Sequence, residues 1–103
     1  MLVRSAVREF LDKGPLPSEE AADEKTAATL TELLHKITAP ITTEEAKLLM
    51  LAFGPDECFG LAWTLVHLIE TAPSCPLRQE PDIYANQWIR CLWERWQRSA
   101  SGA

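Results

Sequence analysis

The chain has 103 residues and a formal net charge of −5, and 47% of its residues are hydrophobic. This length suits one domain that removes roughly 60–70% of its unfolded surface from water, so a core can form without disulfides or metals. The acidic residues concentrate in the segment 14–57, where nine of them accompany only three lysines. A patch of this sign repels phosphate backbones and attracts basic proteins, which argues against nucleic-acid binding.

The first helix is expected over residues 2–13, whose apolar side chains recur on one face. It should end at Gly14-Pro15 because glycine readily takes the left-handed cap position and proline cannot continue the hydrogen-bond ladder. Ser18 is then placed to cap a second helix. The packing face of that helix begins only at its middle, so residues 19–25 are expected to fray. This face comprises Ala27, Leu30, Leu33, Leu34 and Ile37.

The third expected helix has the strongest start signal in the chain. Thr42 and Glu45 stand three residues apart as a capping box, and Ile41 precedes them at the position of a hydrophobic staple. Apolar residues then repeat at helical spacing as far as Gly54-Pro55, where the helix is expected to end.

The segment 56–72 is too apolar for a surface helix and too short for a membrane span. On a helical wheel its polar residues fall in one narrow stripe, and nearly all the others are apolar. We therefore expect a helix that is capped by Asp56, ends at Pro73 and lies at the centre of a bundle. Its residues Trp63, Leu65, Leu68 and Ile69 should be almost fully buried, because they lie away from the polar stripe. The stripe consists of Glu57, Gly60, Thr64, His67 and Thr71.

A proline-rich linker at 73–81 precedes the last expected helix, which opens at Asp82. The apolar residues of this helix span an arc of about 140° on the helical wheel. The arc comprises Ala85, Trp88, Ile89, Leu92, Trp93 and Trp96, while Arg90, Glu94, Gln97 and Arg98 face water. The fold class is therefore all-α, a compact bundle of five helices around the central apolar helix 56–72. We expect one helical domain at 1–98 and a flexible C-terminal tail at 99–103.

The three cysteines, Cys58, Cys75 and Cys91, form no Cys-x-x-Cys pair, and only two histidines could join them. We therefore expect free thiols in a reducing compartment, no metal site and no cofactor. The start of the chain lacks the pattern of a secretory signal, and no segment approaches the ~18 apolar residues of a membrane helix. We expect a cytoplasmic protein without membrane contact.

The sequence offers no catalytic constellation. Cys58 and His67 share one expected helix, but their separation of nine residues places them half a turn out of phase, so they cannot form a dyad. The chain also has no glycine-rich phosphate loop. A small-molecule or enzymatic cleft at Thr64 and His67 is therefore only an alternative hypothesis.

The function we expect is the non-enzymatic binding of another protein, one with a basic surface. In size and charge the chain is similar to bacterial immunity proteins and inhibitors that mask a basic partner, an analogy that carries over no residue. The predicted contacts are the acidic residues Glu44, Glu45 and Glu57, together with Arg90 and Trp93 at the margin of the last helix. A structural or adaptor subunit of an obligate complex or homo-oligomer, held through that margin, is the second hypothesis.

Overall fold

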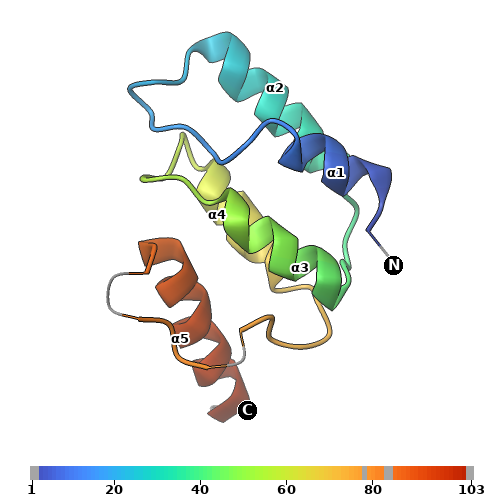
Figure 1. Ribbon diagram of the computed structural model, residues 1–103, viewed down its shortest axis with the longest axis vertical. Coiled ribbons are helices and arrows are strands. Elements are labelled where there is room, and N and C mark those ends of the chain that lie inside the picture. The colour runs from blue at the N-terminus through green and yellow to red at the C-terminus, as the bar shows by residue number, and fades with distance from the viewer. Residues whose placement is uncertain (1–2, 78, 83–84, 102–103) are drawn as a thin grey trace.

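A computed structural model describes residues 3–77, 79–82 and 85–101 of the chain. Within these residues every regular element is a helix, which confirms the all-α prediction. The elements are α1 (Ser5–Leu11), α2 (Glu24–His35), α3 (Thr43–Leu49), the 3₁₀ helix η1 (Met50–Ala52), α4 (Leu61–Ile69) and α5 (Gln87–Ser101). Figure 1 shows α1 and α2 at one end of the molecule, α5 at the other, and α3 and α4 between them.

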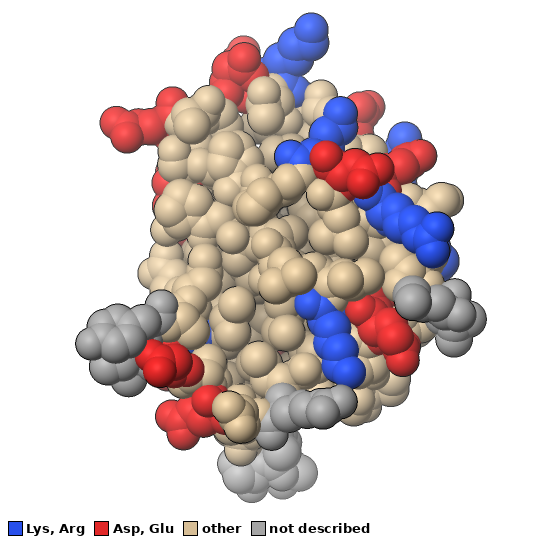
Figure 2. Space-filling view, viewed as in Figure 1, with Lys and Arg blue, Asp and Glu red and all other residues tan. Residues whose placement is uncertain are grey.

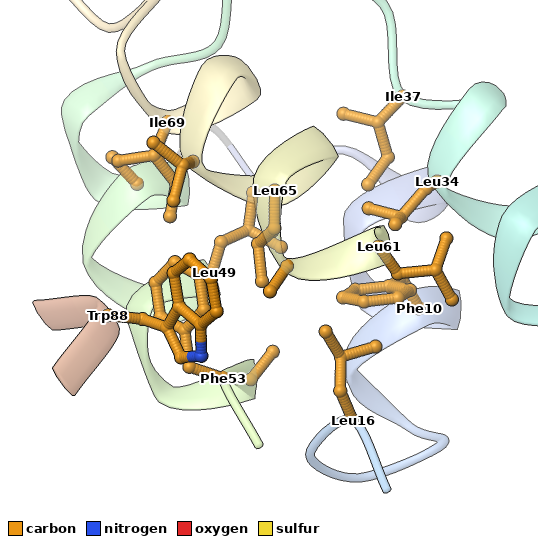
Figure 3. Close-up of a cluster of buried hydrophobic side chains, with 14 of the residues drawn as sticks. Phe10, Leu16, Leu34, Ile37, Leu49, Phe53, Leu61, Leu65, Ile69 and Trp88 are labelled. Atoms are coloured by element: carbon orange, nitrogen blue, oxygen red, sulfur yellow. The ribbon is translucent and has the colours of Figure 1, made fainter. Parts of the chain in front are cut away.

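The hydrophobic core draws on each of these helices, as Figure 3 shows for its larger side chains. α4 contributes most densely, because Leu65, Val66 and Ile69 are fully inaccessible to solvent. Fully burying an apolar side chain of this size stabilises the fold by about 1.5–3 kcal/mol. α4 contacts α2, α3 and α5, so neighbours from both ends of the molecule cover its apolar surface.

The helix predicted over 56–72 is shorter than expected, since α4 spans only Leu61–Ile69. Residues 58–60 all have positive φ angles, of 44°, 55° and 86°. Left-handed residues interrupt a right-handed helix, so the segment before Leu61 forms a turn instead. The N-cap residue of α4 is consequently Gly60 and not Asp56.

Trp63 is 37% exposed, which corrects its predicted burial. It lies four residues before His67, about 40° away on the helical wheel, and therefore shares the polar face of α4. Its indole Nε1 donates a hydrogen bond to the carboxylate of Glu57 (3.0 Å). The burial predicted for Leu65 and Ile69 is confirmed, whereas Leu68, which was also expected to be buried, is only half-buried.

The second helix also begins later than predicted. Asp23 is its N-cap residue, and the Asp23 side chain accepts a hydrogen bond from the backbone N–H of Thr26 (2.7 Å). This hydrogen bond lowers the pKa of Asp23. Ser18 closes only a single turn, in which its hydroxyl accepts a hydrogen bond from the backbone N–H of Ala21 (3.2 Å). The apolar face of the helix starts after these residues, so no packing extends the helix toward Ser18.

The last helix was expected to open at Asp82 and to give way to a tail at 99–103. It opens instead after Asn86, whose side-chain oxygen accepts a hydrogen bond from the backbone N–H of the second helical residue (2.8 Å). It continues to Ser101, so helix replaces the first part of the predicted tail. Residues 102–103 lie outside the described residues.

The chain at Gly54 packs more closely against a neighbouring segment than the Gly54-Pro55 pair alone indicates. A Cβ atom at this position would lie 1.9 Å from the carbonyl oxygen of Leu16, so only glycine fits. The backbone N–H of Leu16 donates to the carbonyl of Ala52 (2.8 Å). The connection after α1 is therefore packed directly against the end of η1.

The carboxylate of Glu45 is fully buried and joins the starts of two helices. The predicted capping box is present, because Glu45 accepts a hydrogen bond from the backbone N–H of Thr42 (2.9 Å). The same carboxylate accepts bonds from Arg4 through its backbone N (3.0 Å), Nε (3.0 Å) and Nη2 (3.2 Å). Arg4 also donates to the hydroxyl and the carbonyl of Thr38 (both 2.9 Å), which ties in the connection between α2 and α3.

Burial alone would raise the pKa of Glu45, but the hydrogen bonds and positive charge of Arg4, with the bond from Thr42, lower it to about 2. The residue is therefore ionised at neutral pH although no solvent reaches it. Its expected role as an exposed partner contact is wrong, because its charge is neutralised inside the protein.

Replacing Arg4 by alanine should cost about 3–5 kcal/mol, because it leaves a buried carboxylate without its cationic partner. Urea unfolding at pH 7 measures the change. Arg8→Ala is the matched control, since Arg8 is exposed on the same helix, and it should change stability by less than about 1 kcal/mol. Similar losses in the two variants would contradict a structural role for the ion pair.

The stability of the protein should fall as the pH is lowered from about 4.5 to about 2. The folded pKa of Glu45 lies below its usual value of 4.5, so its contribution is complete above that pH and disappears as the folded state is protonated. The contribution amounts to about 3 kcal/mol. Glu45→Gln keeps a capping-box residue but cannot titrate, so its stability should change less over this interval. Parallel pH profiles for the two proteins would contradict this assignment.

Candidate functional site

The five residues predicted to contact a partner have different environments. Glu44, Glu57 and Arg90 are exposed, and Trp93 is half-buried. Glu45 is fully buried, so its side chain is not available to a partner. Glu57 and Trp93 line different grooves, so the predicted set does not form one site.

Glu57 lines a cleft of about 380 Å³ that lies between the loop preceding α4 and the start of α5. Three carboxylates and two indole rings form most of its wall. We call it the acidic–aromatic cleft, and its lining residues are Glu19, Asp56, Glu57, Trp63, Gln87 and Trp88. Figure 1 shows that these segments come from three separate stretches of the chain.

The left-handed turn beside this cleft displays an aromatic side chain. Phe59 is 58% exposed, although a left-handed conformation costs a residue with a Cβ atom about 1–2 kcal/mol. Carboxylates hold the turn, since Asp56 accepts from the N–H of Cys58 (3.0 Å) and Glu19 accepts from the N–H of Phe59 (3.2 Å). Asp56 also accepts from the backbone N–H of Glu19 (3.0 Å). The acidic side chains are thus fixed in position by the same bonds that stabilise the turn.

The two indoles of the cleft meet edge to face. The ring centroids of Trp63 and Trp88 are 5.1 Å apart with an interplanar angle of 87°, a favourable aromatic geometry. Trp88 is only 6% exposed and stacks on Phe53 (6.2 Å between centroids), as seen in Figure 3. Its Nε1 is buried and has no hydrogen-bond acceptor among the described residues. Trp63 is the more accessible ring, so it forms the aromatic face that a ligand can reach.

Two amide side chains fix the start of α5 against the opposite side of the cleft. The side chain of Asn86 donates to the carbonyl of Gly54 (3.0 Å), and that of Gln87 donates to the carbonyl of Pro55 (3.1 Å). Figure 1 shows the first turn of α5 next to this loop. The cleft is therefore built on tertiary contacts and does not belong to a single helix.

The cleft carries negative charge that no ion pair among the described residues compensates. In the described part of the chain, ion pairs join Arg4 to Glu45 (3.0 Å) and Arg95 to Glu70 (2.8 Å). Neither pair involves a carboxylate of the cleft. Charges that lack a counterion within the protein attract an oppositely charged partner, an attraction that salt screens over about 8–10 Å.

The cysteines do not supply reactive groups to this surface. Cys58, Cys75 and Cys91 are unpaired. Burial, followed by the negative charges of Asp56 and Glu19, raises the pKa of the Cys58 thiol, so the thiol stays protonated at neutral pH. The described residues contain no group of three or more histidine, cysteine or acidic side chains able to hold a metal ion. Nor do these residues contain a helix of the length and apolarity needed to cross a membrane.

Comparisons of the chain with protein-family models, curated proteins and solved structures find no match. Of the six residues that line the cleft, sequence reasoning named only Glu57 as a partner contact. It placed Glu19 at a helix start expected to fray, and it placed Phe59 and Trp63 inside one continuous helix. The available signal was Gly60, because a glycine early in an apolar segment permits a turn there.

Three other surfaces differ from the cleft in chemistry. Lys13 and Lys25 line a groove of about 370 Å³, which therefore has the opposite sign of charge. Leu51 and Leu48, 70% and 37% exposed, line an apolar groove of about 270 Å³. Trp93 lines a groove of about 410 Å³ together with charged and amide side chains from the linker and α5.

The polar stripe of α4 is open to solvent. Thr64 and His67 are both exposed, and the imidazole lies beside the Trp63 ring (6.3 Å between centroids). Among the described residues neither side chain lines any of the four grooves above.

Phe59→Gly should change the free energy of unfolding by less than about 1 kcal/mol, because relief of the left-handed strain offsets the added chain entropy. Gly60→Ala should cost about 1–2 kcal/mol by the same strain, since nothing lies within 4 Å of a Cβ atom there. Urea unfolding of both variants tests the turn. A loss above about 3 kcal/mol for Phe59→Gly would mean that the ring is packed as core and is not displayed.

Proposed function

We propose that this chain is a non-enzymatic protein that binds a basic protein and masks part of its surface. The acidic–aromatic cleft is the observation that supports this function best. Its three carboxylates have no counterion among the described residues, and they lie beside accessible aromatic side chains. The cleft takes over the role that sequence reasoning assigned to Glu44, Glu45 and Glu57, of which only Glu57 belongs to it.

The composition of this surface suits protein recognition. Aromatic anchors such as Phe59 and Trp63 supply large apolar contact area, which dominates the energy of many interfaces. Carboxylates around such anchors mainly raise the association rate and select the sign of the partner's charge. The groove lined by Lys13 and Lys25 would repel the same basic partner. The charge distribution of the chain would therefore also orient the partner as it approaches.

An adaptor or self-associating subunit is the second candidate function. The exposure of Leu51 and Leu48 on an apolar groove favours it. Figure 2 shows a broad uncharged area across the centre of one face, with charged side chains lying mostly toward its rim. Exposed apolar side chains such as that of Leu51 are common where subunits meet. Arg90 and Trp93 belong to this hypothesis as contacts at the margin of α5.

Glu57→Lys should slow association with the basic partner by roughly tenfold at low salt, because it reverses part of the attraction toward the cleft. The partner is first recovered by affinity purification on the native chain and then purified. Stopped-flow rates at several salt concentrations give the association rate and its salt dependence. The variant should show a smaller salt dependence than the native chain.

Glu32→Lys is the matched control, since it makes the same change in net charge at an exposed position on α2 outside the cleft. Its association rate should stay within about twofold of the native rate. Equal slowing by both variants would assign the effect to overall charge. An unchanged rate and salt slope for Glu57→Lys would contradict the proposal.

A further inference from the structure

The geometry points to a specific ligand for the acidic–aromatic cleft, namely an arginine side chain presented by the partner protein. This inference rests on the proposed function, because it names the group of the basic partner that enters the cleft. It assigns a pocket to one residue type, whereas the proposed function requires only a surface of the right sign.

The charge of the pocket selects a cation. Glu19, Asp56 and Glu57 lie on one cleft and have no ion-pair partner among the described residues. One oxygen of Glu57 accepts the indole N–H of Trp63, and its other oxygen accepts no hydrogen bond within the described part of the chain. One oxygen of Glu19 is likewise unused, since only its Oε2 is bonded to the turn. These oxygens are acceptors held in place and open to a donor.

The composition of the pocket wall favours guanidinium over ammonium. Trp63 is held by its bond to Glu57, and its 37% exposure leaves part of the indole accessible. A guanidinium group is planar, stacks on indole and donates several hydrogen bonds in the plane of its fork. An ammonium group is a compact and strongly hydrated charge that cannot stack. A wall that combines an indole with several carboxylates therefore suits arginine better than lysine.

Trp88 closes the inner wall of the pocket. It is 6% exposed, lines the cleft and meets the Trp63 ring edge to face, so the accessible indole of the pocket rests on a buried one. The cleft volume of about 380 Å³ lies at the small end for ligand sites, which fits one side chain and its backbone.

The defining experiment titrates the ¹⁵N-labelled chain with the blocked peptide acetyl-Gly-Arg-Gly-amide and follows the indole N–H resonances of Trp63 and Trp88. We expect saturable shifts of both resonances that weaken as salt is added. The citrulline peptide, which is nearly isosteric but neutral, should bind at least about tenfold more weakly. The lysine peptide should fall between the two. Equal binding of the arginine and citrulline peptides, or no indole shift with arginine, would overturn the inference.

Two variants locate the binding. Glu57→Gln removes one charge with little change of shape, and Trp63→Leu removes the stacking face; each should weaken binding of the arginine peptide by about tenfold. Glu32→Gln removes an exposed acid outside the cleft and should leave the affinity unchanged. Circular dichroism verifies that each variant is folded. If Trp63→Leu does not fold, Glu57→Gln alone decides, and an unchanged affinity in that variant would refute the pocket.

The purified basic partner separates this inference from the proposed function. If Glu57→Lys slows association with the partner while the arginine peptide fails to bind, the acidic surface is correct and the arginine pocket is wrong. If neither the partner nor the peptide responds to Glu57, both are wrong. If the peptide binds and partner variants lacking one arginine lose affinity by about tenfold, both hold.

Discussion

The ion pair between Arg4 and the buried carboxylate of Glu45 is the contact on which the arrangement of the first three helices depends. Arg4 is the N-cap residue of α1, and Glu45 belongs to the capping box of α3. Their bonds, together with those from Arg4 to Thr38, fix both helix starts and the connection between α2 and α3. A buried charge tolerates few alternative partners, so this contact also limits how the helices can pack.

Much of the fold could be predicted because helical periodicity is a local property. The capping box at Thr42 and the burial of Leu65 and Ile69 follow from spacing alone, and the structure confirms them. The start of α4 did not follow, because two residues with side chains adopt a left-handed conformation there. That conformation depends on hydrogen bonds that the backbone N–H groups of Cys58 and Phe59 donate to Asp56 and Glu19, and Glu19 lies 40 positions from Phe59 in the sequence. A helical wheel contains no such information.

The acidic character of the candidate site could be predicted from the sequence, but the residues that form it could not. The concentration of acids in 14–57 predicted an acidic surface, but not which acids would remain on it. Glu45 is buried because Arg4, which lies 41 residues away in the sequence, binds its carboxylate. Glu19 joined the cleft because its backbone binds Asp56, 37 residues later. Tertiary contacts decide whether each of these acids is buried or lines the cleft, and the net charge of a segment carries no information about such contacts.

The hydrogen bonds that hold Asn86 and Gln87 against the loop at Gly54 and Pro55 have a consequence for local unfolding. The cleft takes Trp63 from α4 and Trp88 from α5, so any occupant contacts both sides of this junction. Detachment of α5 would then require loss of the occupant, and the free energy of opening would rise with its concentration. Amide hydrogen exchange along α5 would therefore slow when the cleft is filled. The helix would thus report occupancy of a site whose carboxylates lie outside it.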